Sequence, residues 1–219
     1  YREGMTVLDG LFWLVDNHED APAFRYTCRS AVCGSCAMII NGKNRLACKT
    51  QISTLGDPIR LEPLSGYEVI KDLVVELTPF FQQYEKVKPY LITVSEPPEK
   101  EYIQTIEQRR TIDETTICIM CSACTSGCPS YLSDARFLGP AALLKDYRFL
   151  ADSRTEDKSL HLETAGATHG AWDCYTCKYC NELCPKQIKL VDNFVNLRRE
   201  LMMEGLVARR LPDILQFYT

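Results

Sequence analysis

The sequence predicts an α+β protein in which a small mixed domain precedes an all-helical domain. The first 94 residues combine helical segments with short β-branched runs, whereas the chain after residue 101 shows helical periodicity. The segment SEPPEKE, residues 95–101, has the tandem prolines and charges of a linker. With 219 residues, the chain is long enough for two small domains. We therefore expect domains over residues 1–94 and 95–219.

Local patterns predict the first elements of the chain. Residues 5–17 repeat apolar side chains at the spacing of a helix. The pair Asn41-Gly42 lies between two short apolar runs and predicts a hairpin, because both residues tolerate the positive φ of a tight turn. Residues 57–64 are then expected to form a further strand.

The later elements are mostly helical. Residues 69–77 are rich in β-branched side chains and predict one strand. Thr78 is expected to cap a helix whose first residue is Pro79. In the second domain, helices are predicted from Gly139 onward and over residues 190–201, where leucine and aromatic side chains recur at helical spacing. We assign these apolar stripes to the core.

Composition and charge argue against several classes of protein. The formal net charge of -4 and the scattered Lys and Arg residues argue against nucleic-acid binding. No run approaches the roughly 18 to 20 apolar residues that cross a bilayer, and the N-terminus does not resemble a signal peptide. We expect a soluble chain without a transmembrane segment. Because the sequence starts at Tyr1 with what resembles a domain interior, we also expect residues upstream of it.

The twelve cysteines form three groups of four, and none lies between Cys48 and Cys118. A disulfide framework would spread its cysteines along the chain to close large loops. Repeated C-x2-C spacings instead place several sulfurs around one point, which is the geometry of a metal or iron–sulfur site. We therefore expect a reduced chain that binds metal clusters.

The first group has the spacing C-x4-C-x2-C followed by x11-C, which is that of a plant-type [2Fe-2S] ferredoxin loop. Gly34 and its small neighbours suit a backbone that wraps closely around an inorganic core. A zinc site is the alternative, although zinc sites favour two C-x2-4-C pairs. The first domain is thus expected to be a plant-type ferredoxin domain with a β-grasp fold. Its predicted ligands are Cys28, Cys33, Cys36 and Cys48.

The second and third groups each follow C-x2-C-x2-C-x3-C-P, the run of bacterial two-cluster ferredoxins. In such a run the fourth cysteine binds the other cluster, so the spacing predicts crossed ligation. Pro129 and Pro185 turn the chain away after each fourth cysteine. One [4Fe-4S] cluster is expected to be held by Cys118, Cys121, Cys124 and Cys184. The other is expected to be held by Cys128, Cys174, Cys177 and Cys180.

Three clusters in one chain predict a carrier of single electrons. The sequence has no Gly-rich dinucleotide fingerprint and no haem-attachment motif. The three histidines, His18, His161 and His169, are isolated, so we interpret them as surface or packing residues. We find no catalytic acid, base or nucleophile in the sequence. The chemistry of any substrate is therefore expected on another subunit.

With these motifs in this order, the chain resembles the iron–sulfur subunits of succinate dehydrogenase and fumarate reductase. The resemblance covers nearly the whole chain and rests on CRSAVCGSCAMIINGKNRLAC, KDLVVELTPFFQQYEKVKPYL, CIMCSACTSGCPSYL and FLGPAALLKDYRFLADSR. It implies a partner flavoprotein that interconverts succinate and fumarate on FAD, with electrons passing between that flavin and a quinone through the three clusters. It also implies an N-terminal hairpin upstream of this sequence.

Three features depart from the usual family pattern. Most members lack a cysteine at the position of Cys177 and hold a [3Fe-4S] cluster there. A fourth thiol favours [4Fe-4S], with Cys177 as a bystander thiol the alternative. Leu132 and Ser133 stand where members place tryptophans of a quinone pocket, and Tyr175 stands where a histidine is usual. These departures resemble an atypical branch whose third cluster is [4Fe-4S] and whose partner is a cysteine-rich subunit related to heterodisulfide reductase.

The resemblance also implies location and partners. The chain is expected to lie on the cytoplasmic face of the membrane, beside either the heterodisulfide-reductase-like subunit or a membrane anchor. A terminal [4Fe-4S] cluster predicts a lower reduction potential than a [3Fe-4S] cluster. The alternatives for function are the iron–sulfur subunit of a thiol-dependent fumarate reductase or of a heterodisulfide-reductase-linked complex, and a free-standing ferredoxin-like carrier.

Overall fold

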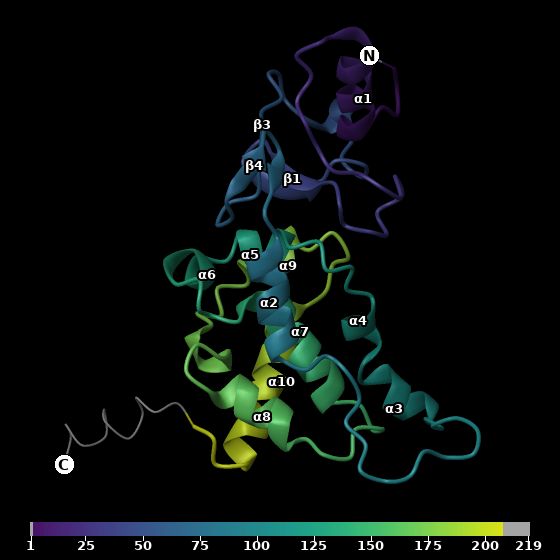
Figure 1. Cartoon of the computed structure of the whole chain (residues 1–219), viewed down its shortest axis with the longest axis vertical. Coiled ribbons are helices and arrows are strands. Elements are labelled where there is room, and N and C mark those ends of the chain that lie inside the picture. Colours follow the sequence, from purple (N-terminus) through teal and green to yellow (C-terminus); the bar gives the residue numbers. More distant parts are fainter. Residues whose placement is uncertain (1, 208–219) are drawn as a thin grey trace, which may run out of the picture.

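The computed structural model of the chain describes residues 2–207 and has two lobes, one above the other in Figure 1. The first lobe contains α1 (Val7–Asn17), β1 (Ala37–Ile40), β2 (Lys43–Leu46), the 3-10 helix η1 (Ile52–Thr54), β3 (Leu61–Glu62), β4 (Val69–Lys71) and β5 (Val74–Val75). A helix, α2 (Thr78–Lys86), runs from this lobe into the second. The second lobe contains α3 (Ile106–Arg110), α4 (Asp113–Thr116), α5 (Ala123–Ser126), α6 (Pro129–Ser133), α7 (Gly139–Leu150), α8 (Ser159–Gly166), the 3-10 helix η2 (Ala171–Asp173), α9 (Tyr179–Leu183) and α10 (Leu190–Met203). The α+β class expected from the sequence is confirmed.

The first helix, α1, starts at a reciprocal cap. The Thr6 hydroxyl accepts a hydrogen bond from the Asp9 amide at 3.2 Å, and the Asp9 carboxylate accepts one from the Thr6 amide at 2.8 Å. One face of the helix buries Val7, Leu8 and Leu11 against the sheet. The helix predicted over residues 5–17 is thereby confirmed.

The Asn41-Gly42 hairpin forms as the sequence predicts. Asn41 and Gly42 have φ of 47° and 75°, and they join β1 to β2 in antiparallel register. The strand β3 adds to the other side of β1, giving the order β2-β1-β3. Met38 and Ile40 of β1 are fully buried, so one face of this sheet covers the core of the lobe. The strand expected over residues 57–64 is reduced to the two residues of β3.

The single strand predicted over residues 69–77 is wrong. The segment is a hairpin of β4 and β5 that turns at Asp72, whose φ is 47°. Aspartate tolerates this conformation because its short polar side chain bonds locally. Here the Asp72 carboxylate accepts a hydrogen bond from the Ala23 amide at 2.8 Å. The polar turn thus interrupts the β-branched run.

The predicted cap of α2 is also wrong by one residue. Thr78 is the first residue of the helix and Leu77 occupies the cap position, so Pro79 lies in the first turn as expected but not at its start. The Thr78 hydroxyl donates to the Glu76 carboxylate at 2.6 Å instead of accepting from the helix. A nearby carboxylate therefore competes successfully for the hydroxyl that a cap would use.

The second lobe is built around α7 and α10. Leu143 and Leu144 of α7 and Phe194 and Leu197 of α10 have essentially no solvent exposure, which confirms the predicted apolar stripes as core. Phe80 of α2 joins the same core. Between residues 87 and 105, all of which the structure describes, the chain forms neither helix nor strand. The domain division at residue 94 remains a prediction.

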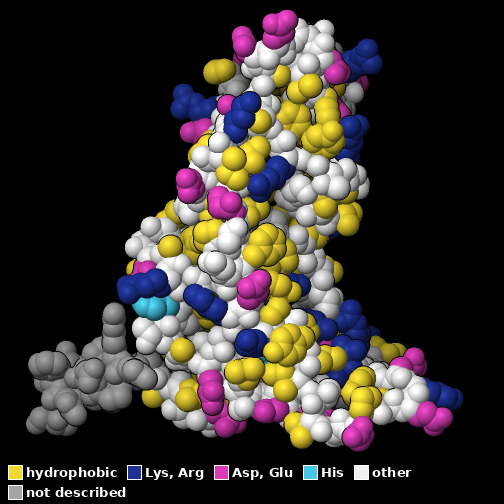
Figure 2. Space-filling view, in the orientation of Figure 1, with side chains coloured by type: hydrophobic (Ala, Val, Ile, Leu, Met, Phe, Trp, Pro, Cys, Tyr) yellow, Lys and Arg dark blue, Asp and Glu magenta, His cyan; other side chains and the backbone are white. Residues whose placement is uncertain are grey.

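The surface carries charges of both signs. Figure 2 shows acidic and basic side chains interspersed over both lobes on the face that it presents. In the part of the chain that the structure describes, no helix is both long and apolar enough to cross a bilayer.

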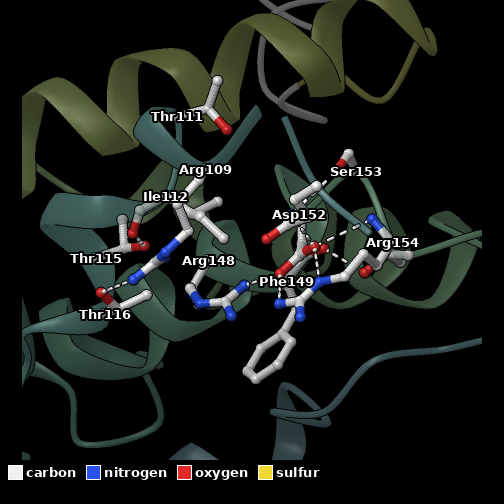
Figure 3. Close-up of polar contacts among 12 residues, drawn as sticks. Arg109, Thr111, Ile112, Thr115, Thr116, Arg148, Phe149, Asp152, Ser153 and Arg154 are labelled. Carbon is white, nitrogen blue, oxygen red and sulfur yellow. Dashed lines mark hydrogen bonds and ion pairs between the residues drawn. The ribbon is translucent and has the colours of Figure 1, made fainter. Parts of the chain in front are cut away.

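A buried carboxylate ties the end of α7 to the loop before α3. The Asp152 side chain has no solvent exposure and pairs with both Arg148 and Arg154, the latter at 2.8 Å. Gln104 donates a further hydrogen bond to it at 3.0 Å. Figure 3 shows the two guanidinium groups directed at this carboxylate. Burial acts to raise the pKa of Asp152, but the hydrogen bonds from Arg154 and Arg148 outweigh it and lower the pKa to about 2.

We expect Asp152→Asn to lower the free energy of unfolding by about 3–5 kcal/mol, because it leaves two partly buried guanidinium groups unpaired. Thermal unfolding of the purified protein should then shift down by at least about 6 °C. Because the pKa of Asp152 is below the ordinary 3.8, this stabilisation is present above that pH and is lost as the pH falls toward 2. Asp113→Asn is the control, since Asp113 pairs with Arg109 at 3.2 Å on the open surface, where such a pair contributes less than about 1 kcal/mol. Equal shifts in the two variants would contradict the assignment.

Candidate iron–sulfur sites

The first group of cysteines surrounds a tight loop at residues 28–36. The Val32 amide donates to Cys28 Sγ at 3.3 Å, and the Ala31 amide donates to Cys48 Sγ at 3.3 Å. The second of these bonds brings Cys48, which lies beyond β2, against the loop. Sulfur atoms that accept several amide hydrogen bonds are stabilised as thiolates. The loop therefore has the form that a negatively charged sulfur site requires.

Hydrogen bonding and burial act in opposite directions on these thiols. Amide hydrogen bonds, led by that of Ser30, lower the pKa of Cys28 to about 6. Burial raises the pKa of Cys36 to about 12, and Cys36 neighbours both Cys33 and Cys48. All four predicted residues of the first site are therefore brought together.

The second and third groups line two separate cavities in the helical lobe, with empty volumes of about 340 and 290 Å³. The first of these cavities is lined by Cys118, Cys121, Cys124 and Cys184. The second is lined by Cys128, Cys174, Cys177 and Cys180. Each cavity thus takes three cysteines from one run and the fourth from the other, which is the crossed grouping that the spacing predicts.

The two runs repeat the same backbone conformation. Met120 and Thr176, which occupy equivalent places, have φ of 52° and 54°, and Ser122 and Lys178 both have φ of 64°. Each run then enters a short helix, α5 or α9, and these two helices pack against each other. Turns with positive φ direct successive amides toward one point, as anion-binding backbone does. Each run can therefore donate amides to the sulfurs that it carries.

Burial dominates the ionisation of the cavity thiols. It raises the pKa of Cys121 and of Cys180 to about 12, and that of Cys124 well above the ordinary value. Such thiols are neutral at pH 7 in the absence of metal. Metal binding to them releases protons, so the loading of these sites is coupled to pH.

The donor set fits iron–sulfur clusters better than single metal ions. Within residues 2–207, no three Cys, His, Asp or Glu side chains converge closely enough to hold one ion. The thiols instead line cavities with apolar walls, formed by Leu144 in one and by Phe194 in the other. Four cysteines around such a space match the thiolate coordination of iron–sulfur clusters.

The third site is open toward solvent on one side. Cys177 is exposed, whereas Cys128 and Cys180 of the same cavity are buried. Tyr175 is 67% exposed and Leu132 49% exposed. Of the residues that depart from the family pattern, Cys177 and Tyr175 therefore line the accessible side of this site, whereas Leu132 does not line the cavity.

The three histidines lie away from the cavities. His18 is exposed and packs edge-on against Trp13. His161 is fully buried, with its Nδ1 at 3.1 Å from the Asp146 carboxylate. His169 lies 3.3 Å from the Asp173 carboxylate at the surface. None of the three lines a cysteine cavity.

Sequence reasoning missed Arg198, which supports the third site from α10. Its guanidinium donates to the carbonyl oxygen of Cys174 at 2.6 Å and to that of Ala171 at 2.7 Å, and it lies over the Trp172 ring. Its charge acts to lower the pKa of Cys174, although burial has the larger effect and raises it. Spacing alone gave no signal for this residue, because an arginine on the polar side of a helix is ordinary.

Family models and a solved structure match both lobes. A model described as "2Fe-2S iron-sulfur cluster binding domain" matches residues 1–82, and one described as "4Fe-4S dicluster domain" matches residues 114–188. The structure titled "Mycobacterium smegmatis Sdh1 complex in the apo form" contains a chain that superposes with a TM-score of 0.83 at 25% identity, covering 95% of this chain and 89% of that one. Fold and sites together define an iron–sulfur protein with two ferredoxin-type domains.

Curated relatives specify the family. The "Succinate dehydrogenase iron-sulfur subunit" of Coxiella burnetii is 40% identical over 92% of this chain and 86% of its own length, and the "Fumarate reductase iron-sulfur subunit" of Mycobacterium tuberculosis is 39% identical over 84% and 75%. The chain belongs to the family of iron–sulfur subunits of succinate dehydrogenase and fumarate reductase, and it is therefore part of an oxidoreductase complex. The resemblance inferred from its motifs is confirmed.

We expect Arg198→Gln to lower the midpoint potential of a cluster bound at the third site by on the order of 50–100 mV, because a nearby positive charge favours the reduced form. A redox titration followed by electron paramagnetic resonance measures this shift. Arg199→Gln is a matched control, since it removes the same charge from the exposed neighbouring position. Arg198→Lys should retain most of the wild-type potential. Equal shifts in the two glutamine variants would contradict a specific effect of Arg198.

Proposed function

We propose that this chain is the electron-transfer subunit of a succinate:quinone oxidoreductase or fumarate reductase. It relays single electrons between an FAD-containing subunit, on which succinate and fumarate interconvert, and a quinone-side subunit. The names of the relatives support this function, and the chain spans 75% or more of the length of the two reported above.

The relay uses three clusters in this proposal. The [2Fe-2S] cluster is held by Cys28, Cys33, Cys36 and Cys48. The first [4Fe-4S] cluster is held by Cys118, Cys121, Cys124 and Cys184. The third cluster, also [4Fe-4S], is held by Cys128, Cys174, Cys177 and Cys180. When bound, such clusters accept and release one electron at a time. The observation that carries the assignment is the pair of cavities, each lined by a crossed set of four cysteines.

The chain itself holds the clusters, shields their sulfur atoms from water and stabilises the charge of the thiolates. Apolar side chains such as Leu144 and Phe194 form the cavity walls and exclude water from the sulfurs. Backbone amides at the first loop stabilise thiolate charge.

The third site favours a particular kind of quinone-side partner. Cys177 supplies a fourth thiol to the cavity. Leu132 and Ser133 stand where the family usually has tryptophans of the quinone pocket, and Tyr175 stands where it usually has a histidine. We therefore assign the chain to the branch whose partner is a cysteine-rich subunit related to heterodisulfide reductase, at the cytoplasmic face of the membrane. A membrane anchor with stoichiometric haem b in the purified complex would refute this choice of partner.

The function itself is tested by purification under native conditions. An affinity-tagged chain is expected to bring down a flavin-containing subunit in equal amount, with about ten irons per copy of this chain. Purification of the chain alone, with its clusters but without flavin, would instead support a free-standing carrier. Activity with a thiol donor in place of a quinol would favour a thiol-dependent fumarate reductase.

The cluster type at the third site depends on Cys177. We expect the oxidised wild-type complex to be silent in electron paramagnetic resonance, because oxidised [2Fe-2S] and [4Fe-4S] centres are diamagnetic. Cys177→Ser should remove about one iron and create the signal of an oxidised [3Fe-4S] centre. Cys180→Ser, at a buried position of the same cavity, should lose the whole cluster and serves as the control. A strong [3Fe-4S] signal already in fresh wild type, unchanged by Cys177→Ser, would make Cys177 a bystander.

A further inference from the structure

Gly34 of the first cysteine loop lies directly against a cysteine of the helical lobe. Gly34 is buried and has φ of +77°. A Cβ atom added to it would lie 2.6 Å from Cys121 Cβ and 2.8 Å from Cys121 Cα. Real Cβ atoms essentially never approach other atoms so closely. The absence of a side chain at Gly34 is therefore what allows the two cysteine loops to touch.

The two residues after Cys121 are also held by the N-terminal lobe. The Ser122 hydroxyl pairs with the Tyr67 hydroxyl at 2.5 Å, and the Ala123 carbonyl accepts a hydrogen bond from the side-chain Nδ2 of Asn44 at 2.8 Å. Three consecutive residues are thus contacted by three separate parts of that lobe: the first cysteine loop, the segment between β3 and β4, and β2. In Figure 1, α5 and α9 lie at the top of the helical lobe, beneath the sheets.

The contacts are buried, which makes them specific. Ser122 has no solvent exposure, and Asn44 is 8% exposed. Burial raises the pKa of Tyr67, so its hydroxyl stays neutral and hydrogen-bonded. Buried polar groups that lose their partners are costly, so any sliding of one lobe on the other breaks these bonds unfavourably. The junction thus has one preferred register.

We propose that this junction sets the separation between the [2Fe-2S] cluster and the first [4Fe-4S] cluster, with Gly34 as the positioning residue. The inference rests on the ligands assigned under the proposed function. Cys33 and Cys121 are ligands of the two clusters. The path from Cys33 through Gly34 to Cys121 follows covalent bonds except for one non-bonded contact, between Gly34 and Cys121. Electron tunnelling between two centres falls off steeply with their separation, so a closer junction gives faster transfer.

A methyl group at position 34 must push the two loops apart. Ordinary van der Waals contact begins at 3.4 Å, whereas the added Cβ would lie at 2.6 Å from Cys121. The obstructing atoms belong to the backbone and Cβ of Cys121, which cannot rotate away. Gly34→Ala is therefore expected to increase the separation of the clusters.

Dipolar electron paramagnetic resonance on the purified complex, with both clusters reduced, tests the proposal. The magnetic coupling between two paramagnetic centres falls with the cube of their distance. Gly34→Ala is expected to lose part of the wild-type coupling at full iron content. Gly42→Ala is the matched control, because Gly42 has φ of +75° and nothing within 4 Å of an added Cβ. It carries the same backbone strain without the contact and should keep the wild-type coupling.

A second variant covers the case in which Gly34→Ala does not assemble. Tyr67→Phe keeps the ring beside Tyr131 and removes only the hydroxyl pair with Ser122. It is expected to lose a smaller part of the coupling. If Gly34→Ala shows the wild-type coupling, the inference is overturned and the proposed function stands. If Gly34→Ala does not assemble, wild-type coupling in Tyr67→Phe overturns the inference in the same way. A wild-type complex without either cluster signal overturns the ligand assignment, and the inference with it.

Discussion

The exchange of one cysteine between the two C-x2-C-x2-C-x3-C-P runs constrains the whole helical lobe. Cys184 lines the cavity of the first run and Cys128 lines the cavity of the second, although α7 and α8 separate the runs along the chain. The short helices α5 and α9 must therefore pack together, and α7 lies beside both cavities through Leu144 and Pro140. A change that moves one run disturbs both sites, so the lobe behaves as one unit around its thiols.

The sites were largely predictable because their information is local. The spacing of the cysteines within each run follows from the need to place several sulfurs around one small object, and no tertiary contact alters it. The crossed grouping could be predicted because, in this motif, the fourth cysteine of each run binds the other cluster. Arg198 could not, because its role depends on α10 lying across η2, and neither spacing nor charge pattern encodes that contact. The inter-lobe contacts of Gly34 and Tyr67 were missed for the same reason.

The fold shows the same division between local and distant information. The Asn41-Gly42 turn was predicted correctly because its φ angles are a property of the two residues themselves. The run over residues 69–77 was misassigned because its β-branched composition outweighed the turn signal of Asp72, which is stabilised by a bond to the distant Ala23 amide. The Thr78 hydroxyl likewise donates its hydrogen bond to the Glu76 carboxylate instead of capping α2. In both errors, a side chain forms a hydrogen bond with a partner that residue propensities do not predict.

Exposure differs along the three sites in the way that a relay requires. None of the four cysteines that line the cavity of Cys118, Cys121, Cys124 and Cys184 is exposed, and Leu144 of α7 forms part of its apolar wall. The outer two sites each reach the surface, through Val32 of the first cysteine loop, which is 60% exposed, and through Cys177 at the third cavity. In the proposed relay, a partner can therefore approach either outer site, and the first [4Fe-4S] cluster passes electrons between the other two clusters. In the proposed relay, the junction at Gly34 acts on the step between the [2Fe-2S] cluster and the first [4Fe-4S] cluster, and Arg198 and Cys177 act at the third site.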